Sequence, residues 1–179
     1  RQLKVSKYCH SEPACVKLIV NAMKGNMAKL ATHAVASRVV ESLFSNMTSK
    51  QTVMLKQEFY GPHFALFAND ATLLSDNPTL ESNLALAPDK KDVTLDFVRH
   101  LVNKGVEKSL FGLTYFQKLF AEYVGVAPPI EIRALAATSA DHAIHLLSTR
   151  SGTRVVAALT AYGTAKDRKR ILKSLKGYT

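Results

Sequence analysis

Apolar residues recur at intervals of three and four positions along almost the whole chain. Stretches of this kind begin near Val16, Val35 and Ile144, and no alternating period of two or Asn-Gly hairpin signal accompanies them. This period predicts amphipathic helices, which glycines and prolines divide into pieces of about ten to fifteen residues. We therefore expect an all-α fold built from many short helices.

One helical pattern occurs three times. Segments that begin at Ala36, Gly112 and Gly152 each start with a small residue and carry apolar residues at their fourth, fifth and eighth positions. The starts are 76 and 40 residues apart, which indicates a repeated unit of about 38 residues. A fourth, degenerate copy is expected near residue 74, just before Pro78.

Each copy has a shorter helix before it and a longer helix after it. The shorter helices are predicted at 27–33, 60–69, 106–111 and 141–149, and the longer ones at 49–58, 90–101, 129–137 and 165–175. A three-helix unit of this size cannot bury its own apolar face, so we expect the units to stack into an α-solenoid. The expected units are 25–59, a degenerate unit at 60–103, 104–138 and 139–179, preceded by the end of another unit in 1–24.

The first residues fit this unit poorly. Residues 12–23 have the pattern of a third helix, but too few residues precede them for the first two helices of a unit. Either the second helix is lost, or residues are missing near 8–11. Because the chain begins with Arg1 rather than Met, we expect it to be a piece of a longer protein.

Charge adds a candidate partner to this picture. The 179 residues contain 24 Lys and Arg against 14 Asp and Glu, a net charge of +10, and residues 150–179 contain eight basic residues and one acidic residue. A concentrated positive field favours a polyanion, either nucleic acid or an acidic membrane surface, although a solvated helix face is the alternative. No apolar run is long enough to cross a bilayer, and two cysteines are too few for a disulfide framework, which fits a reducing intracellular compartment.

Several segments resemble the Pumilio (PUF) repeat family. The short helix that starts Ser37-Arg38-Val39-Val40-Glu41 is similar to the second helix of a PUF repeat. Residues 58–67 (EFYGPHFALF), 24–37 and 152–169 resemble the divergent Puf-A branch of that family, in the same order and spacing. The likeness extends from about Lys7 to Thr179.

The resemblance implies an α-solenoid that binds RNA with little sequence preference in the nucleolus. It implies a role in pre-60S (large ribosomal subunit) assembly and rRNA processing, with pre-rRNA or other RNA, pre-60S ribosomal proteins and assembly factors as partners. It implies no enzyme activity, no cofactor, no membrane association and no small-molecule substrate. Two alternatives stay open, namely a sequence-specific PUF regulator of mRNA translation or decay, and a protein-binding array of the HEAT or armadillo kind.

In PUF repeats, two or three side chains of each second helix meet one base. The corresponding sets here are Ser37, Arg38 and Glu41; Asn77, Pro78 and Glu81; Leu113, Thr114 and Gln117; and Thr153, Arg154 and Ala157. Only the first set has suitable groups at all three positions. Because one base cannot specify a site, we expect phosphate contacts to dominate the affinity. The candidates for these contacts are Lys29, Arg38, Lys118, Arg150 and Arg154.

The last predicted helix is amphipathic and strongly basic. Its apolar residues Ile171, Leu172 and Leu175 are expected to face the core. The cations Lys166, Arg168, Lys169 and Arg170 are expected to face outward, toward rRNA, a protein partner or solvent alone.

Other chemistry finds little support in the residues. Asp141, His142 and His145 could present metal ligands, but no further residue completes a site, and we expect an ordinary surface or interhelix pair. Tyr115 and Phe116 occupy apolar core positions rather than stacking positions. No catalytic constellation or phosphate-binding glycine loop is present in the sequence.

Overall fold

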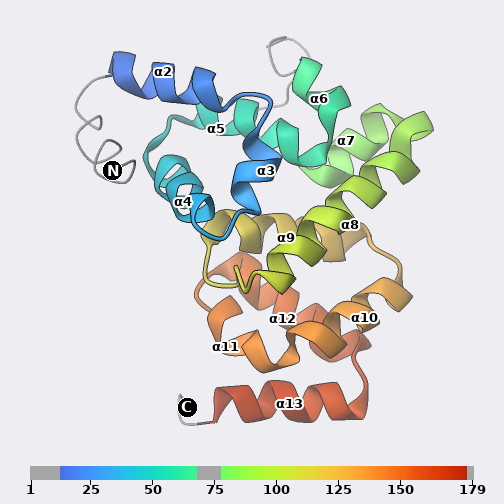
Figure 1. Ribbon diagram of the computed structural model, residues 1–179. Helices are drawn as coiled ribbons and strands as arrows, with labels where there is room; N and C mark the ends of the chain where they lie inside the picture. Colours follow the sequence, from blue (N-terminus) through green and yellow to red (C-terminus); the bar gives the residue numbers. More distant parts are fainter. Residues whose placement is uncertain (1–12, 68–77, 177–179) are drawn as a thin grey trace. The chain divides into compact units, whose positions relative to one another are not determined.

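The computed structural model describes residues 13–67 and 78–176, with side chains described over 18–64 and 78–176. Every element in these ranges is an α-helix or a short 3-10 helix (Figure 1), so the predicted all-α fold is confirmed. None of the helices described is long and apolar enough to cross a membrane. The chain divides into two units, residues 1–101 and residues 102–179.

The first unit consists of short helices. In chain order they are α2 (Pro13–Met23), α3 (Met27–Ala31), α4 (Ala36–Asn46), α5 (Ser49–Lys56), η2 (Gln57–Tyr60), α6 (Pro62–Phe67), α7 (Leu80–Leu86), η3 (Pro88–Lys90) and most of α8 (Lys91–Glu107). Helices α5 and α7 each begin with a threonine capping box, at Thr48 and Thr79. The interior contains Met27, Val40, Leu55, Phe59 and Leu80, all at most 2% exposed.

Glu58 holds the turn that precedes α3. Its two carboxylate oxygens accept hydrogen bonds from the backbone N–H groups of Gly25 at 2.8 Å and Met27 at 2.9 Å. These donors lie at the start of α3, where a helix has unpaired N–H groups. Glu58 therefore joins η2 to α3 and supplies the cap that the residues preceding α3 do not provide.

The second unit follows the end of α8. It contains α9 (Thr114–Val126), α10 (Pro129–Ser139), η4 (Ala140–His142), α11 (Ala143–Leu146), α12 (Arg150–Tyr162) and α13 (Ala165–Leu175). Helix α12 packs against both α9 and α10, and α13 lies across η4 and α11 (Figure 1). The core is rich in aromatic residues, including Phe111, Phe116, Phe120 and Tyr123. The prediction that Tyr115 and Phe116 are core residues is confirmed, since they are 5% and 2% exposed.

Most predicted helices match the structure within a few residues, but two do not. The degenerate copy expected from near residue 74 begins as α7 only at Leu80, after the non-helical Pro78 and Thr79. The segment 106–111 is not a separate helix, because α8 continues through Glu107 and ends in a turn at Ser109, whose φ is 55°. No proline interrupts the chain between Leu101 and Ser109, so the third helix of one predicted unit runs into the first helix of the next. Predictions that fall on residues 1–12, 68–77 and 177–179 lie outside the described residues.

Candidate nucleic-acid interface

The first predicted base-reading set lies on α4, and its member Ser37 has a structural role rather than the predicted one. This residue is fully buried, and its hydroxyl donates a hydrogen bond to the carbonyl oxygen of Ala34. A base edge cannot reach a hydroxyl in that position, so the assignment of Ser37 to RNA contact is wrong. Arg38 is exposed and Glu41 is half-exposed on the same helix, which leaves two of the three predicted side chains accessible.

Gln117 of α9 forms hydrogen bonds inside the protein and is not available to recognise a base. It is fully buried, and its amide nitrogen lies 2.6 Å from the carbonyl oxygen of Phe111, 2.9 Å from that of His145 and 2.9 Å from Ser148 Oγ. Its oxygen accepts a hydrogen bond from the hydroxyl of Thr149 at 2.5 Å. Because Thr149 also caps α12, Gln117 connects α9 to the start of α12.

Replacing Gln117 by leucine should destabilise residues 102–179 by about 2–4 kcal/mol, because the change leaves buried carbonyl oxygens without their donor. Urea unfolding followed by circular dichroism measures the difference in the free energy of unfolding. The neighbouring variant Lys118→Leu changes an exposed residue and should shift stability by less than about 0.5 kcal/mol. Unchanged stability together with altered base preference in Gln117→Leu would instead place this amide at a base edge.

On α12, the corresponding side chains also offer little for base recognition. Thr153 is exposed, but its hydroxyl donates to the carbonyl oxygen of Thr149 at 3.0 Å. Ala157 is exposed and has no polar group. Arg154 is exposed between them along the helix, so the accessible chemistry of this helix is a positive charge.

The degenerate unit provides no reading set among its described residues. Pro78 is buried, and its carbonyl oxygen accepts a hydrogen bond from Lys56 Nζ at 2.9 Å. Glu81 is exposed in the first turn of α7, whereas Asn77 lies outside the described residues. A buried proline cannot stack on a base, so this position is structural.

The cations predicted to hold phosphates are accessible. Five side chains are exposed, namely Lys29 in the last turn of α3, Arg38 on α4, Lys118 on α9, and Arg150 and Arg154 on α12. Arg150 lies in the first turn of α12, where the helix dipole is also positive. Exposed cations of this kind are suited to phosphate contacts, which carry no sequence information.

Helix α13 presents a row of lysines. Lys166 and Lys169 are exposed as predicted, and Lys173 and Lys176 continue their spacing along the helix end. Lys176 is the residue that directly follows α13, and steps of three, four and three residues keep all four lysines on one side of the helix. Arg168 is exposed too, and its guanidinium donates to the carbonyl oxygen of Gly163 at 2.8 Å.

Two predictions for this helix are wrong. Leu172 does not face the core, since it is 70% exposed, and only Ile171 is fully covered, at 2%. Arg170 does not point outward, because it donates to both carboxylate oxygens of Asp141, at 3.0 and 2.5 Å, and to the carbonyl oxygen of Ala137 at 2.7 Å. Hydrogen bonding from Arg170 lowers the pKa of Asp141. Arg170 thus anchors α13 to the end of α10 and to η4, and phosphates would have to displace this ion pair.

The aspartate and two histidines near residue 141 show no metal-binding arrangement. Asp141 is occupied by Arg170, and the ring of His142 stacks on Phe111 with 4.6 Å between centroids and 14° between planes. Over the described residues, no group of three or more His, Cys, Asp or Glu side chains could hold a metal ion. The stacked ring identifies His142 as a packing residue.

Comparison with known proteins identifies the family of this chain. No family model matches the chain. It is 30% identical over 162 residues to Pumilio homolog 3 of Rattus norvegicus and 30% identical over 151 residues to Pumilio homology domain family member 6 of Schizosaccharomyces pombe. The crystal structure of human Puf-A superposes with a TM-score of 0.76 at 29% identity and covers 92% of this chain. The chain belongs to the Puf-A branch of the Pumilio family.

Membership of the Puf-A branch confirms the predicted fold class, an all-α array of PUF repeats. A second human structure, Puf-A in complex with DNA, superposes with a TM-score of 0.77 at 28% identity and covers 93% of this chain. The chain spans about a quarter of the length of the curated relatives it matches, 24% for the rat protein, and 32% of the human Puf-A chain.

Proposed function

We propose that this chain binds RNA through its phosphate backbone, with little sequence specificity, as part of a factor that acts in nucleolar pre-60S assembly and rRNA processing. Pre-rRNA is the proposed ligand. Pre-60S ribosomal proteins and assembly factors are the proposed protein partners. The chain acts as a binding scaffold and not as an enzyme.

One observation carries this proposal. On α4, α9 and α12, the second helices of the predicted units, the cations are accessible whereas two of the predicted base-reading residues are buried. The cations Arg38, Lys118 and Arg154 are exposed, whereas the reading positions Ser37 and Gln117 are buried and bonded internally. Helices with this distribution of groups can attract phosphates but can distinguish few bases. The structure of human Puf-A with DNA supports nucleic-acid binding by this family.

The lysines of α13 extend the proposed ligand surface. Lys166, Lys169 and Lys173 are exposed on a helix that packs mainly against η4 and α11 and also contacts α12. They are suited to a second stretch of rRNA or to an acidic segment of a protein partner. A factor that works in ribosome assembly would benefit from holding more than one surface at once.

A sequence-specific regulator of mRNA is the second candidate. It is favoured by one observation, because Arg38 and Glu41 remain accessible on α4 with a stacking plane and an acceptor. A single base position is worth about 1–3 kcal/mol of discrimination. That is too little to select an mRNA, so the backbone-binding proposal takes precedence.

Two measurements test the proposal. With purified chain, fluorescence anisotropy should give affinities for oligouridine, oligoadenine and a mixed-sequence RNA that agree within about threefold and fall steeply with salt. In cells, crosslinking of the full-length protein followed by RNA sequencing should enrich pre-rRNA. A recurrent short motif in mRNAs, with a matching preference in vitro, would establish the second candidate instead.

A further inference from the structure

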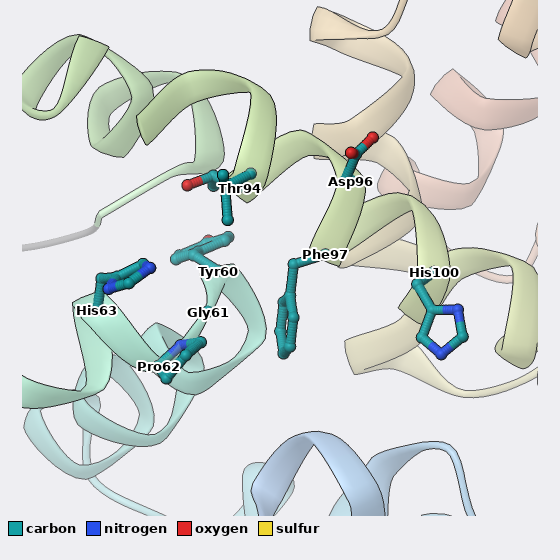
Figure 2. Close-up of a pocket in the computed structure, with 9 residues that line it drawn as sticks. Tyr60, Gly61, Pro62, His63, Thr94, Asp96, Phe97 and His100 are labelled. Carbon is teal, nitrogen blue, oxygen red and sulfur yellow. The ribbon is translucent and has the colours of Figure 1, made fainter. Parts of the chain in front are cut away.

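A pocket of about 410 Å³ opens in the first unit, between the turn that joins η2 to α6 and the facing side of α8. Tyr60, Pro62 and His63 line it from the turn, and Val93 and Phe97 line it from α8 (Figure 2). This volume lies within the range of pockets that hold small ligands, about 300–1,000 Å³. The cations proposed to hold RNA do not line this pocket.

A glycine turn shapes the pocket. Gly61 has a φ of 121°, a conformation that favours glycine, and it turns the chain directly from the buried Tyr60 into Pro62. The nearest side-chain atoms to a Cβ placed on Gly61 would be those of Phe97, at 3.9 and 4.0 Å. The Phe97 ring projects from α8 beside this turn (Figure 2). The turn belongs to residues 58–67, the segment that resembles the Puf-A branch.

The wall of the pocket is made almost entirely of carbon. The Thr94 hydroxyl is buried and has no hydrogen-bond partner among the described residues, so it is not presented to a ligand. The Tyr60 hydroxyl is 3.4 Å from the carbonyl oxygen of Pro78 and donates to it. Val93 is 59% exposed, which leaves an apolar side chain uncovered on the pocket wall. Contact with an apolar group would remove this surface from water.

The charges around the pocket argue against a nucleic-acid ligand. Asp96 is the charged residue of the lining, and its carboxylate is paired with Arg99 at 2.6 Å, just outside the lining. No lysine or arginine belongs to the lining, although the whole chain has a net charge of +10. A phosphate would therefore find no lysine or arginine in the lining to bind it, whereas an uncharged apolar side chain needs no such partner.

We propose that this pocket is a docking site for a protein partner, which inserts one aliphatic or aromatic side chain of an uncharged peptide segment between Pro62 and Phe97. Val93 extends the apolar contact along α8. His63, which is half-exposed, and His100, which is exposed, supply ring nitrogens that can bond to the peptide backbone. The site is separate from the RNA-binding proposal and does not depend on it.

Peptide selection on the purified 179-residue chain tests this proposal. A random dodecapeptide library displayed on phage is selected on the chain, and the enriched peptides are synthesised and measured by fluorescence anisotropy. The blocking variant is Val93→Phe, which fills the pocket from an exposed position. The matched control is Val35→Phe, because Val35 is also an exposed valine of the first unit, 65% against 59%, and does not line the pocket.

We expect the enriched peptides to share an apolar residue. Val93→Phe should weaken their binding about tenfold or more, and Val35→Phe by less than about twofold. Affinity for oligouridine should be the same in both variants as in the original chain, and hexauridylate should not displace the peptides. Peptides that bind Val93→Phe as well as the original chain, a failure to enrich any peptide, or displacement by hexauridylate would each overturn the proposal.

Discussion

Replacing Gly152 by alanine should destabilise residues 102–179 by about 3 kcal/mol or more. A Cβ at this position would lie 1.7 Å from the carbonyl oxygen of Leu146 and 2.8 Å from the side-chain oxygen of Gln117. The first of these atoms belongs to the backbone, so it cannot rotate away, and α12 would have to shift as a whole. The shift would also disturb the hydrogen bond from the Thr149 hydroxyl, at the start of α12, to the side-chain oxygen of Gln117 in α9, now 2.5 Å long.

A second glycine on a neighbouring helix provides the control. Gly125 lies in α9 with no atom within 4 Å of a Cβ built on it. Because alanine favours the helix over glycine by up to about 1 kcal/mol, Gly125→Ala should be neutral or slightly stabilising. Thermal unfolding followed by circular dichroism compares the two variants. Equal melting temperatures would show that α12 and Leu146 are not in the close contact described here.

Reversing the charges of Arg38 and Arg154 should weaken RNA binding about 25-fold at 0.1 M salt if each arginine neutralises one phosphate. For a single strand, each such contact contributes about −0.7 to the slope of log K against log salt. Each contact therefore raises the binding affinity at 0.1 M salt about fivefold relative to that at 1 M salt. We expect the double variant Arg38→Glu and Arg154→Glu to lose affinity equally for oligouridine and oligoadenine and to have a slope smaller in magnitude by about 1.4.

The control for this experiment must change the net charge by the same amount elsewhere. Lys50 on α5 and Lys104 on α8 are both exposed and belong to neither the reading helices nor α13. The variant Lys50→Glu with Lys104→Glu should lose much less affinity, because only the long-range field changes and salt screens it. The same loss in both double variants would mean that α4 and α12 do not contact the phosphates.

The helices could be predicted because their signals are local. The apolar spacing, the prolines at Pro88 and Pro129 and the threonine at position 164 mark helix starts within the sequence itself, and the structure begins η3, α10 and α13 at these signals. The exception at 106–111 has a local cause as well. The sequence contains no proline that stops α8 before Glu107. Gly105 could have ended the helix, but it lies inside α8, where the Phe116 ring packs at the place of a side chain.

The candidate site could be predicted less well, because its residues were placed by analogy with other repeats. The spacing placed Arg38, Lys118 and Arg154 on second helices, and all three are exposed there. It also placed Ser37 and Gln117 at reading positions, where both are buried. A polar residue on an amphipathic helix is expected to face water unless other parts of the chain supply its hydrogen bonds, and those partners are not visible in the helix pattern.

By itself, the sequence determined the all-α class, the resemblance to Puf-A and the concentration of charge in the last thirty residues, and it predicts a repeat of three helices. The tertiary structure alone decided which polar groups are accessible. It turned Gln117 inward against Phe111 and His145, bound Arg170 to Asp141, and left Leu172 and Val93 uncovered. The physical reason is that helix periodicity follows from neighbours in sequence, whereas burial and hydrogen-bond partners depend on residues far away in the sequence, such as Gln117 and His145, which are 28 positions apart.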